Sequence, residues 1–279
     1  MARFPGTRGF WRLTWAWRRE SEKTGTATVN VLDGGEFGGG AGDASSGSRA
    51  ITLTDVQAWY GESHILQGVT MHVDHGEIVC LLGRNGAGRT TALRAIMGLV
   101  SRRTGRIVIN DRDAIDLQPH QIARLGVGYC PEERGIMATL TCEENLIFPP
   151  KVAAGGMELR EIYAMFPNLE SRRTSYGGHL SGGEQQMLAV ARILCTGARI
   201  LLLDEISEGL APVIVQALAQ MIRELRSRGF TILMVEQNSR FAVPLADRFY
   251  VMARGEIVRE FAASELRGDA NILQEYLSV

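Results

Sequence analysis

The chain has 279 residues, of which 45% are hydrophobic, and a formal net charge of -1. This length allows a full hydrophobic core, and the balanced charge argues against a protein that binds nucleic acid. No window approaches the roughly 18 uninterrupted apolar residues of a membrane span, and the N-terminus lacks the apolar core of a signal peptide. We therefore expect a cytoplasmic protein whose link to any membrane is made through other subunits.

The first 50 residues differ in composition from the rest of the chain. They contain three of the four tryptophans, and the glycine- and serine-rich stretch 32–49 has too few apolar residues to offset chain entropy. We predict that 1–50 is a flexible or disordered extension with a Gly/Ser linker, followed by one domain over 51–279. The alternative is that the tryptophans and arginines over 11–18 form a segment that contacts lipid headgroups. In this segment apolar and polar residues alternate as in a strand, and the segment is too short for an interfacial helix.

From Ala50 onward, short β-branched runs alternate with stretches of helical period, which predicts an α/β fold. The runs predicted as strands of an antiparallel flank are 51–56, 69–73 and 105–109. The runs predicted as buried strands of a core sheet are 78–82, 200–203 and 231–235. The pattern between Cys142 and Arg192 is helical, which indicates a helical subdomain over about 140–195.

A glycine-rich loop over 83–90 reads Gly-Arg-Asn-Gly-Ala-Gly-Arg-Thr, between the apolar strand 78–82 and a helical stretch. This is the context of the phosphate-binding pattern G-x-x-x-x-G-K-T, in which backbone N–H groups and the helix N-terminus face an anion. Thr90 would place its hydroxyl on Mg²⁺, and Arg89, in place of lysine, would have to reach the phosphates with a planar guanidinium. The candidate nucleotide-binding residues here are Gly83, Asn85, Gly86, Gly88, Arg89, Thr90 and Thr91.

The segment 180–186 reads Leu-Ser-Gly-Gly-Glu-Gln-Gln and precedes an apolar helical run. Ser181 and Glu184 form a capping-box pattern, which alone would be structural. Two glycines in a first helical turn are poor helix formers, and they are better explained if this helix end exposes its amides to a bulky anion. We therefore expect Ser181, Gly182, Gly183 and Glu184 to contact nucleotide.

The apolar strand 200–203 runs into two adjacent carboxylates, Asp204 and Glu205. Adjacent acids repel unless a cation or a proton is handled there. We predict that Asp204 holds Mg²⁺, directly or through water, and that Glu205 orients and deprotonates the attacking water. A solvated acidic turn is the alternative.

In this order and spacing, the segments 83–90, 180–186 and 201–205 resemble the Walker A, signature and Walker B motifs of ABC transporter ATP-binding subunits. The resemblance covers 51–279 and implies a P-loop NTPase fold of ABC type, with ATP and Mg²⁺ as cofactors. Finer matches point to the second ATPase subunit of branched-chain amino acid importers and to their urea and short-chain amide relatives. Those matches are 131–135, 140–146, 207–212 and 235–238.

The resemblance implies further site residues. Glu132 occupies the place of the glutamine of the Q-loop, where it would serve both catalysis and the metal site, and Gln237 occupies the place of the switch histidine. Tyr60, beside Trp59, matches the aromatic residue that stacks on adenine. A buried hydrophobic pair is the alternative for these two aromatic residues.

The resemblance also implies partners. Two ATPase chains would pair head to tail, so that each ATP lies between the glycine loop of one chain and the signature helix of the other. The branched-chain amino acid importers that the chain resembles use two different ATPase subunits, so we expect a heterodimer, with a homodimer as the alternative. A groove beside Glu132 would receive a helix of one of two membrane permease subunits, served by an external solute-binding protein, and the chain would lie at the cytoplasmic face of the inner membrane.

Two positions depart from the family pattern: Arg89 replaces the lysine, and Ile206 replaces the proline after the catalytic glutamate. Lys23 and Lys151 are the only lysines among 30 basic residues, so compositional drift explains the origin of Arg89 but not its chemistry. We expect weakened nucleotide binding and hydrolysis reduced on the order of 10²-fold or more, the scale for losing one transition-state donor, whereas Ile206 relaxes a turn. The alternatives are a regulatory or scaffold subunit without hydrolysis and a soluble ABC ATPase unrelated to transport.

Overall fold

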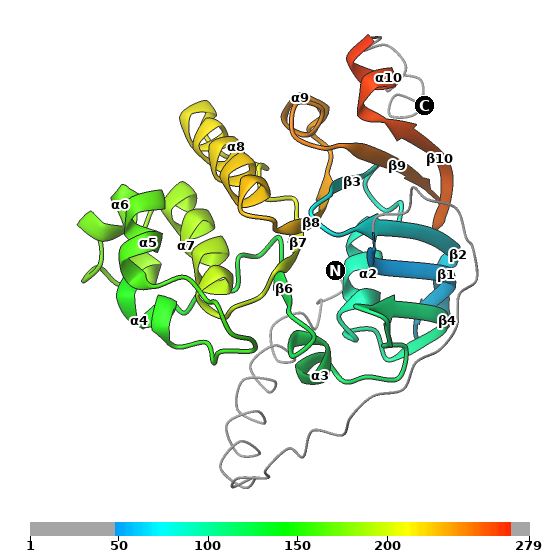
Figure 1. Cartoon of the computed structure of the whole chain (residues 1–279), viewed down its shortest axis with the longest axis horizontal. Helices are drawn as coiled ribbons and strands as arrows, with labels where there is room; N and C mark the ends of the chain where they lie inside the picture. The colour runs from blue at the N-terminus through cyan, green and yellow to red at the C-terminus, as the bar shows by residue number, and fades with distance from the viewer. Residues whose placement is uncertain (1–47, 269–279) are drawn as a thin grey trace, which may run out of the picture. The chain divides into compact units, whose positions relative to one another are not determined.

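The computed structural model describes residues 48–268. The predicted extension over 1–50, with its tryptophans, therefore lies almost wholly outside the described residues, as does the end of the predicted domain after 268. The described residues form an α/β fold with two sheets, as predicted (Figure 1). Within this range no helix is both long enough and apolar enough to cross a membrane.

The first sheet is the predicted antiparallel flank, with strand order β2-β1-β4-β5. Strands β1 and β2 are longer than their apolar runs indicated, because they continue as a tight hairpin in which Tyr60 pairs with Ser63. Gly61 has a φ of 58°, which a turn of this kind readily uses. The hairpin tip thus holds Tyr60 at one end of the sheet. The strands are β1 Arg49–Tyr60, β2 Ser63–Asp74, β4 Arg102–Ile109 and β5 Arg112–Asp113.

The second sheet has the order β10-β9-β3-β8-β7-β6, and its strands are parallel except for β10. Its adjacent strands β3, β8 and β7 are the three predicted core strands. Strands β6, β9 and β10 were not predicted from the sequence, since β6 is very short and β10 mixes charged with apolar residues. The strands are β3 Ile78–Gly83, β6 Val127–Cys130, β7 Ile200–Asp204, β8 Thr231–Glu236, β9 Arg248–Ala253 and β10 Glu256–Ala262.

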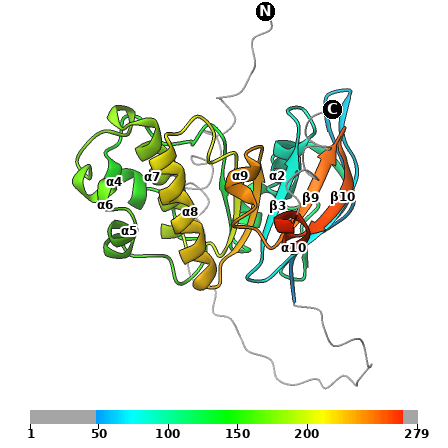
Figure 2. The ribbon, with the colours of Figure 1, turned by 90° about the horizontal axis from the view of Figure 1, so that it is seen from above.

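The helices cover this second sheet. Helix α2 follows the glycine loop and contacts β2, β3 and β7, whereas α4 to α8 gather beside the sheet on the side away from β1 and β2 (Figures 1 and 2). Helices α4 to α7 lie in the chain between β6 and β7, where the helical subdomain was predicted. The helices are α2 Arg89–Ile96, α3 Pro119–Ala123, α4 Cys142–Ile147, α5 Leu159–Met165, α6 Pro167–Ser171, α7 Gly182–Cys195, α8 Pro212–Ser227, α9 Ser239–Ala242 and α10 Ala263–Gly268.

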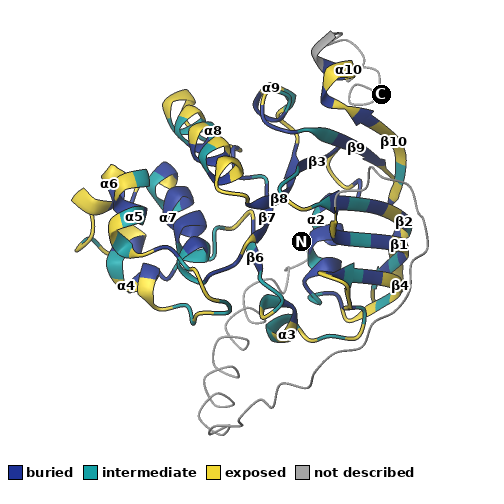
Figure 3. Ribbon diagram, in the orientation of Figure 1, coloured by how far each residue is buried: buried dark blue, intermediate teal, exposed yellow. Residues whose placement is uncertain are grey.

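The central strands are buried on both faces (Figure 3). Along β3, Ile78, Cys80 and Leu82 pack into a hydrophobic cluster with residues of α7 and α8. The alternate residues Val79 and Leu81 pack into a second cluster with α2 and the antiparallel sheet. Burial on both faces explains why the core strands are continuous apolar runs and do not alternate with polar residues. The residues that follow the carboxyl ends of these strands are polar and form the candidate functional site.

Candidate functional site

The glycine loop over 83–90 connects β3 to α2, as the sequence predicted. Gly86 and Gly88 have φ angles of 81° and 107°, a region that favours glycine. A Cβ at Gly83 would lie 2.4 Å from the carbonyl oxygen of Met252, so the loop passes too close to β9 for a side chain there. The first turn of α2 contains no acidic residue, which leaves its positive end available to an anion.

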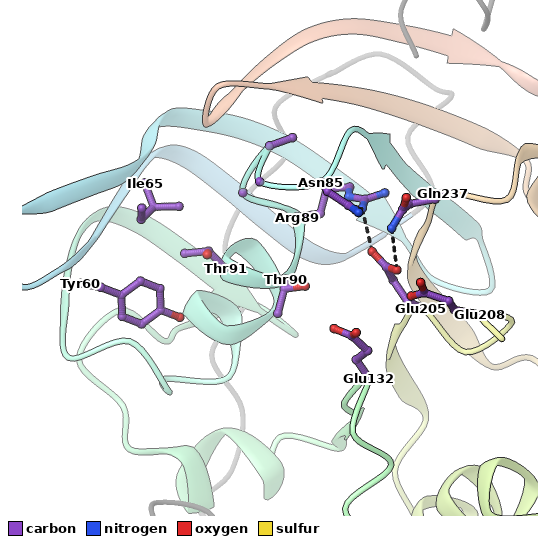
Figure 4. A pocket seen from close by; sticks show the side chains of 13 residues that line it. Tyr60, Ile65, Asn85, Arg89, Thr90, Thr91, Glu132, Glu205, Glu208 and Gln237 are labelled. Atoms are coloured by element: carbon purple, nitrogen blue, oxygen red, sulfur yellow. Dashed lines mark hydrogen bonds and ion pairs between the residues drawn. The ribbon is translucent and has the colours of Figure 1, made fainter. Parts of the chain in front are cut away.

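A cavity of about 410 Å³ lies at this loop (Figure 4). It brings together five separate parts of the chain: the β1–β2 hairpin, the glycine loop, the segment after β6, the end of β7 and the end of β8. Ile65, Ala87 and Glu208 line it without having been predicted. The predicted site residues that line it are Tyr60, Asn85, Gly86, Gly88, Arg89, Thr90, Thr91, Glu132, Glu205 and Gln237.

Tyr60 lies at one end of the cavity, and its side chain is 43% exposed. Trp59 turns elsewhere: its ring stacks on His64 with centroids 4.5 Å apart, and the Arg102 guanidinium lies 4.6 Å from its centroid. The two aromatic residues are therefore not a buried hydrophobic pair. Tyr60 lines the cavity and is partly exposed, and adenine stacking stays a prediction.

Asp204 ends β7 and is fully buried behind the cavity. Its Oδ1 accepts a hydrogen bond from Thr90 Oγ1 at 3.0 Å, and its Oδ2 accepts one from the Tyr129 hydroxyl, also at 3.0 Å. Burial raises the pKa of Asp204 to about 6, although both hydrogen bonds lower it. The Thr90 hydroxyl and the Asp204 carboxylate are hard oxygen donors lying side by side, which fits Mg²⁺.

The Arg89 side chain is buried and points toward Glu205 (Figure 4). Its Nη2 lies 2.7 Å from Glu205 Oε1, in an ion pair whose side chains are only 4% and 8% exposed. Arg89 also donates to the Glu236 carbonyl oxygen at 3.0 Å and to Asn85 Oδ1 at 3.3 Å. Gln237 Nε2 donates to the other oxygen of Glu205, Oε2, at 2.9 Å. Both oxygens of the predicted catalytic carboxylate are thus held, a contact that the sequence did not predict.

The turn after β7 aims Glu205 at the cavity. Glu205 has a φ of 48°, which is uncommon for a residue other than glycine, and its N–H donates to the Val235 carbonyl oxygen at 2.9 Å. The next residue, Ile206, is 1% exposed and packs in the cluster that contains α7 and α8. Ile206 therefore does more than relax a turn: it anchors the turn that carries Glu205 in the core.

The cavity has a surplus of negative charge. Among its lining residues, Arg89 is the one cation against Glu132, Glu205 and Glu208. Burial and the nearby Glu205 raise the pKa of Glu132, and a hydrogen bond with Glu205 followed by burial raises that of Glu208. Phosphates entering such a site require a cation to offset this charge.

The side-chain oxygens of Thr90, Asp204 and Glu132 suit a magnesium ion that is bound partly by protein and partly by substrate. Residues 48–268 contain no group of three or more His, Cys, Asp or Glu side chains that could hold a metal ion. Mg²⁺ is commonly bound through one or two carboxylates together with substrate phosphates, and does not need an all-protein cage. Thr90, Asp204 and Glu132 supply such a partial set, and their role as metal ligands stays a prediction.

Glu236 ends β8, next to Gln237, and is 1% exposed. Its carboxylate accepts hydrogen bonds from the Ser207 hydroxyl at 2.8 Å and from the Ser207 backbone N–H at 3.2 Å. Burial raises the pKa of Glu236 to about 7, although the bonds from Ser207 lower it. This pair, which the sequence did not predict, ties the strand end that carries Gln237 to the turn that carries Glu205.

Glu236→Gln should stabilise the chain at alkaline pH. Because the folded-state pKa of Glu236 is raised, ionising it opposes folding as the pH rises from about 4.5 through 7. Glutamine keeps a bond to Ser207 without the charge, so the free energy of unfolding should rise by about 2 kcal/mol at pH 8 and be unchanged at pH 4. Thermal unfolding at both pH values checks this, with the exposed Glu256→Gln as control. A gain of equal size at both pH values would contradict the explanation.

The signature residues lie at the N-terminus of α7 and do not line the cavity of a single chain. The predicted capping box is confirmed: the Glu184 N–H donates to Ser181 Oγ at 3.3 Å, and the Ser181 N–H donates to Glu184 Oε2 at 2.8 Å. A Cβ at Gly183 would lie 2.8 Å from the Ile214 side chain, so close packing against α8 also favours glycine at this position. Nucleotide contact by Ser181, Gly182, Gly183 and Glu184 stays a prediction.

Residues 66–208, about half of the chain, match the ABC transporter family. The chain belongs to this family of ATPases. This ABC ATPase is 36% identical to the high-affinity branched-chain amino acid transport ATP-binding protein BraG of Pseudomonas aeruginosa, over 81% of this chain and 99% of BraG. It is 35% identical to the probable branched-chain amino acid transport ATP-binding protein LivF of Archaeoglobus fulgidus, over 77% and 93%. It is 33% identical to the lipopolysaccharide export system ATP-binding protein LptB of Escherichia coli, over 81% and 96%.

Solved structures agree with this assignment. The ABC ATPase is similar to the structure of an ATP binding subunit of an ABC transporter, with a TM-score of 0.69 and 28% identity over 81% of this chain and 97% of that one. It is also similar to a dimeric ATP-binding cassette in a post-hydrolysis state bound to ADP and Pi, with a TM-score of 0.67 and 25% identity over 76% and 98%. The predicted P-loop ATPase fold of ABC type is thereby confirmed.

Proposed function

We propose that this ABC ATPase is the ATP-binding and ATP-hydrolysing subunit of an importer for branched-chain amino acids or related small solutes. Two of the relatives described above are named for branched-chain amino acid transport, and the matches span nearly their full length. LptB, which is named for lipopolysaccharide export, is almost as similar. The ATPase therefore powers transport, and the choice of solute rests with the partner proteins.

The residues of the cavity suit nucleotide binding. We propose that the loop over 83–90 binds the phosphates through its backbone, that Tyr60 stacks on the adenine, and that Thr90, Asp204 and Glu132 hold Mg²⁺. Mg²⁺, when bound, neutralises charge that develops on the phosphates.

Glu205 is the residue placed to orient and deprotonate an attacking water, since it faces the cavity from the end of β7. Gln237 holds one of its oxygens at 2.9 Å and in this way fixes the direction of the carboxylate. We propose that these two residues, with Glu132, form the catalytic group.

Arg89 slows turnover in this proposal, and one observation carries that part: its 2.7 Å ion pair with Glu205. A guanidinium that lies on Glu205 cannot at the same time lie on a phosphate. A carboxylate whose oxygens accept bonds from Arg89 and Gln237 is also less available to take a proton from water. The same contact favours a second candidate, a nucleotide-binding subunit that regulates a partner ATPase without hydrolysing ATP itself.

The placement of the signature residues outside the cavity supports a second ATPase subunit as partner. We propose that a second ATPase subunit supplies its signature helix to this site and receives α7 in return. The dimeric cassette of known structure supports such pairing. A heterodimer is favoured over a homodimer, and two membrane permease subunits, fed by an external solute-binding protein, would hold the chain at the cytoplasmic membrane face.

Reconstitution in lipid vesicles tests the proposal. The chain is combined with the permease and partner ATPase of its own genome, and the binding protein is added with or without leucine. Leucine-loaded binding protein should stimulate ATP hydrolysis several-fold. Stimulation only by a solute unrelated to the branched-chain amino acids would overturn the solute assignment, and absence of ATP binding by every combination that contains the chain would overturn the function as a whole.

A further inference from the structure

Asp204 is held by hydroxyl groups on both of its oxygens. Thr90 Oγ1 donates to Oδ1 and the Tyr129 hydroxyl donates to Oδ2, each at 3.0 Å. The carboxylate is fully buried, so its orientation depends on these bonds and not on solvent. Thr90 is accounted for as a ligand of Mg²⁺ in the proposed function, whereas nothing in that function uses Tyr129.

We infer that Tyr129 is the positioning residue of the metal site: its hydroxyl fixes the Asp204 carboxylate in the orientation in which it meets Mg²⁺. The inference rests on the proposed function, since it concerns the metal site of that ATPase. It assigns a role to a residue that no motif in the sequence marks.

The fold holds the Tyr129 ring in place. Strand β6 pairs in parallel with β7, and Tyr129 lies opposite Leu202, two residues before Asp204. Leu202 and Asp204 share one face of β7 because side chains alternate along a strand. The Tyr129 ring packs against the hydrophobic cluster that contains Leu202. The core therefore anchors the ring, and the hydroxyl reaches from the edge strand to Asp204.

The direction of the hydroxyl hydrogen follows from its acceptor. An ionised carboxylate has only acceptor oxygens, so the Tyr129 hydroxyl donates its hydrogen to Asp204 Oδ2.

Tyr129 differs from Thr90 in what Mg²⁺ binding would require. A hydroxyl oxygen keeps its lone pairs when it donates its hydrogen, so Thr90 can ligate Mg²⁺ directly while it stays bonded to Oδ1. The Tyr129 hydroxyl lies on Oδ2 and would act on the metal only through Asp204. Removing the outer hydrogen-bond partner of a metal ligand weakens metal binding by about 10- to 100-fold.

The test is a magnesium titration of Tyr129→Phe in the full chain. Binding of a fluorescent ATP analogue is measured first in EDTA and then at increasing Mg²⁺. Phenylalanine keeps the ring, so the affinity in EDTA should stay within about 2-fold, while the Mg²⁺ concentration for half-maximal effect should rise on the order of 10-fold. Tyr163→Phe is the matched control, because the Tyr163 hydroxyl donates to Glu143 Oε2 at 2.9 Å, away from the cavity.

Three results would overturn the inference. In the first, Tyr129→Phe has the magnesium requirement of wild type. In the second, it loses affinity equally in EDTA and in Mg²⁺, or loses cooperative thermal unfolding, which would make the residue only structural. In the third, the wild-type chain binds nucleotide without any effect of Mg²⁺, and then the proposed metal site itself fails. The first two leave the proposed function intact, so the two failures are distinguishable.

Discussion

Arg89→Lys should raise ATP hydrolysis on the order of 10²-fold in the reconstituted transporter, the scale for restoring one well-placed donor to the transition state. Lysine is a compact point charge with a flexible stem, whereas arginine is a planar fork that suits carboxylates. In the structure this fork lies on Glu205, Asn85 and the Glu236 carbonyl oxygen. Two nitrogens of the guanidinium span these acceptors, Nη1 for the Glu236 carbonyl oxygen and Nη2 for Glu205 and Asn85. The single nitrogen of lysine does not reproduce this span, so we expect it to be available to the phosphates.

The measurement is steady-state phosphate release, with nucleotide affinity determined in parallel. Turnover should rise strongly and nucleotide affinity should rise by less, because a freed cation binds the phosphates of the bound nucleotide and also stabilises the charge that develops during the reaction. Arg112→Lys is the control, since Arg112 is an exposed residue of β5 outside the cavity. Equal turnover of Arg89→Lys and wild type would mean that the loop accommodates arginine and that this is an ordinary transport ATPase.

Glu205→Gln should remove measurable hydrolysis and, at the same time, tighten ADP binding about 10-fold, which corresponds to about 1.4 kcal/mol. Glutamine cannot take a proton from water, and loss of a positioned general base costs about 10²- to 10⁴-fold in rate. The gain in affinity comes from Arg89. In Glu205→Gln the buried guanidinium of Arg89 loses its anionic partner, and a buried charge without a partner is unfavourable. Binding a phosphate of ADP supplies a new partner, so ADP binds more tightly.

A double-mutant cycle isolates this exchange. ADP affinity is measured for wild type, Arg89→Lys, Glu205→Gln and the double variant, and ADP is used because it is not hydrolysed. The effect of Glu205→Gln should be much smaller when residue 89 is lysine, since residues in contact give non-additive effects. Glu208→Gln is the control for charge, because it removes a carboxylate that lines the same cavity and forms no ion pair with Arg89. An equal gain in Glu208→Gln would show a general charge effect and contradict the exchange.

Much of the site could be predicted because its signals are local. The glycine loop over 83–90 is recognisable from glycines whose positive φ angles the structure confirms at Gly86 and Gly88. The capping box of Ser181 and Glu184 spans a single turn, so its spacing alone predicts its hydrogen bonds. Local spacing also identified the three apolar strands whose carboxyl ends carry the site.

The partners of those residues could not be predicted in the same way, because they are distant in the chain. Whether Arg89 faces a phosphate or Glu205 depends on the order β3-β8-β7, which brings the ends of three strands together. Tyr129 lacked any signal, since its strand β6 is four residues long and contains a glycine. Its contact with Asp204 exists only because β6 pairs with β7.

The sequence by itself thus determined the chemistry that is present: a phosphate-binding loop, paired carboxylates at a strand end and a capped signature helix. These depend on residue type and on spacing within a few residues, which a linear pattern contains. Only the tertiary structure decided which group each side chain meets: Arg89 with Glu205, Glu236 with Ser207 and Tyr129 with Asp204. The physical reason is that strand order and burial select these partners, and a guanidinium or a hydroxyl binds whichever acceptor the fold brings within reach.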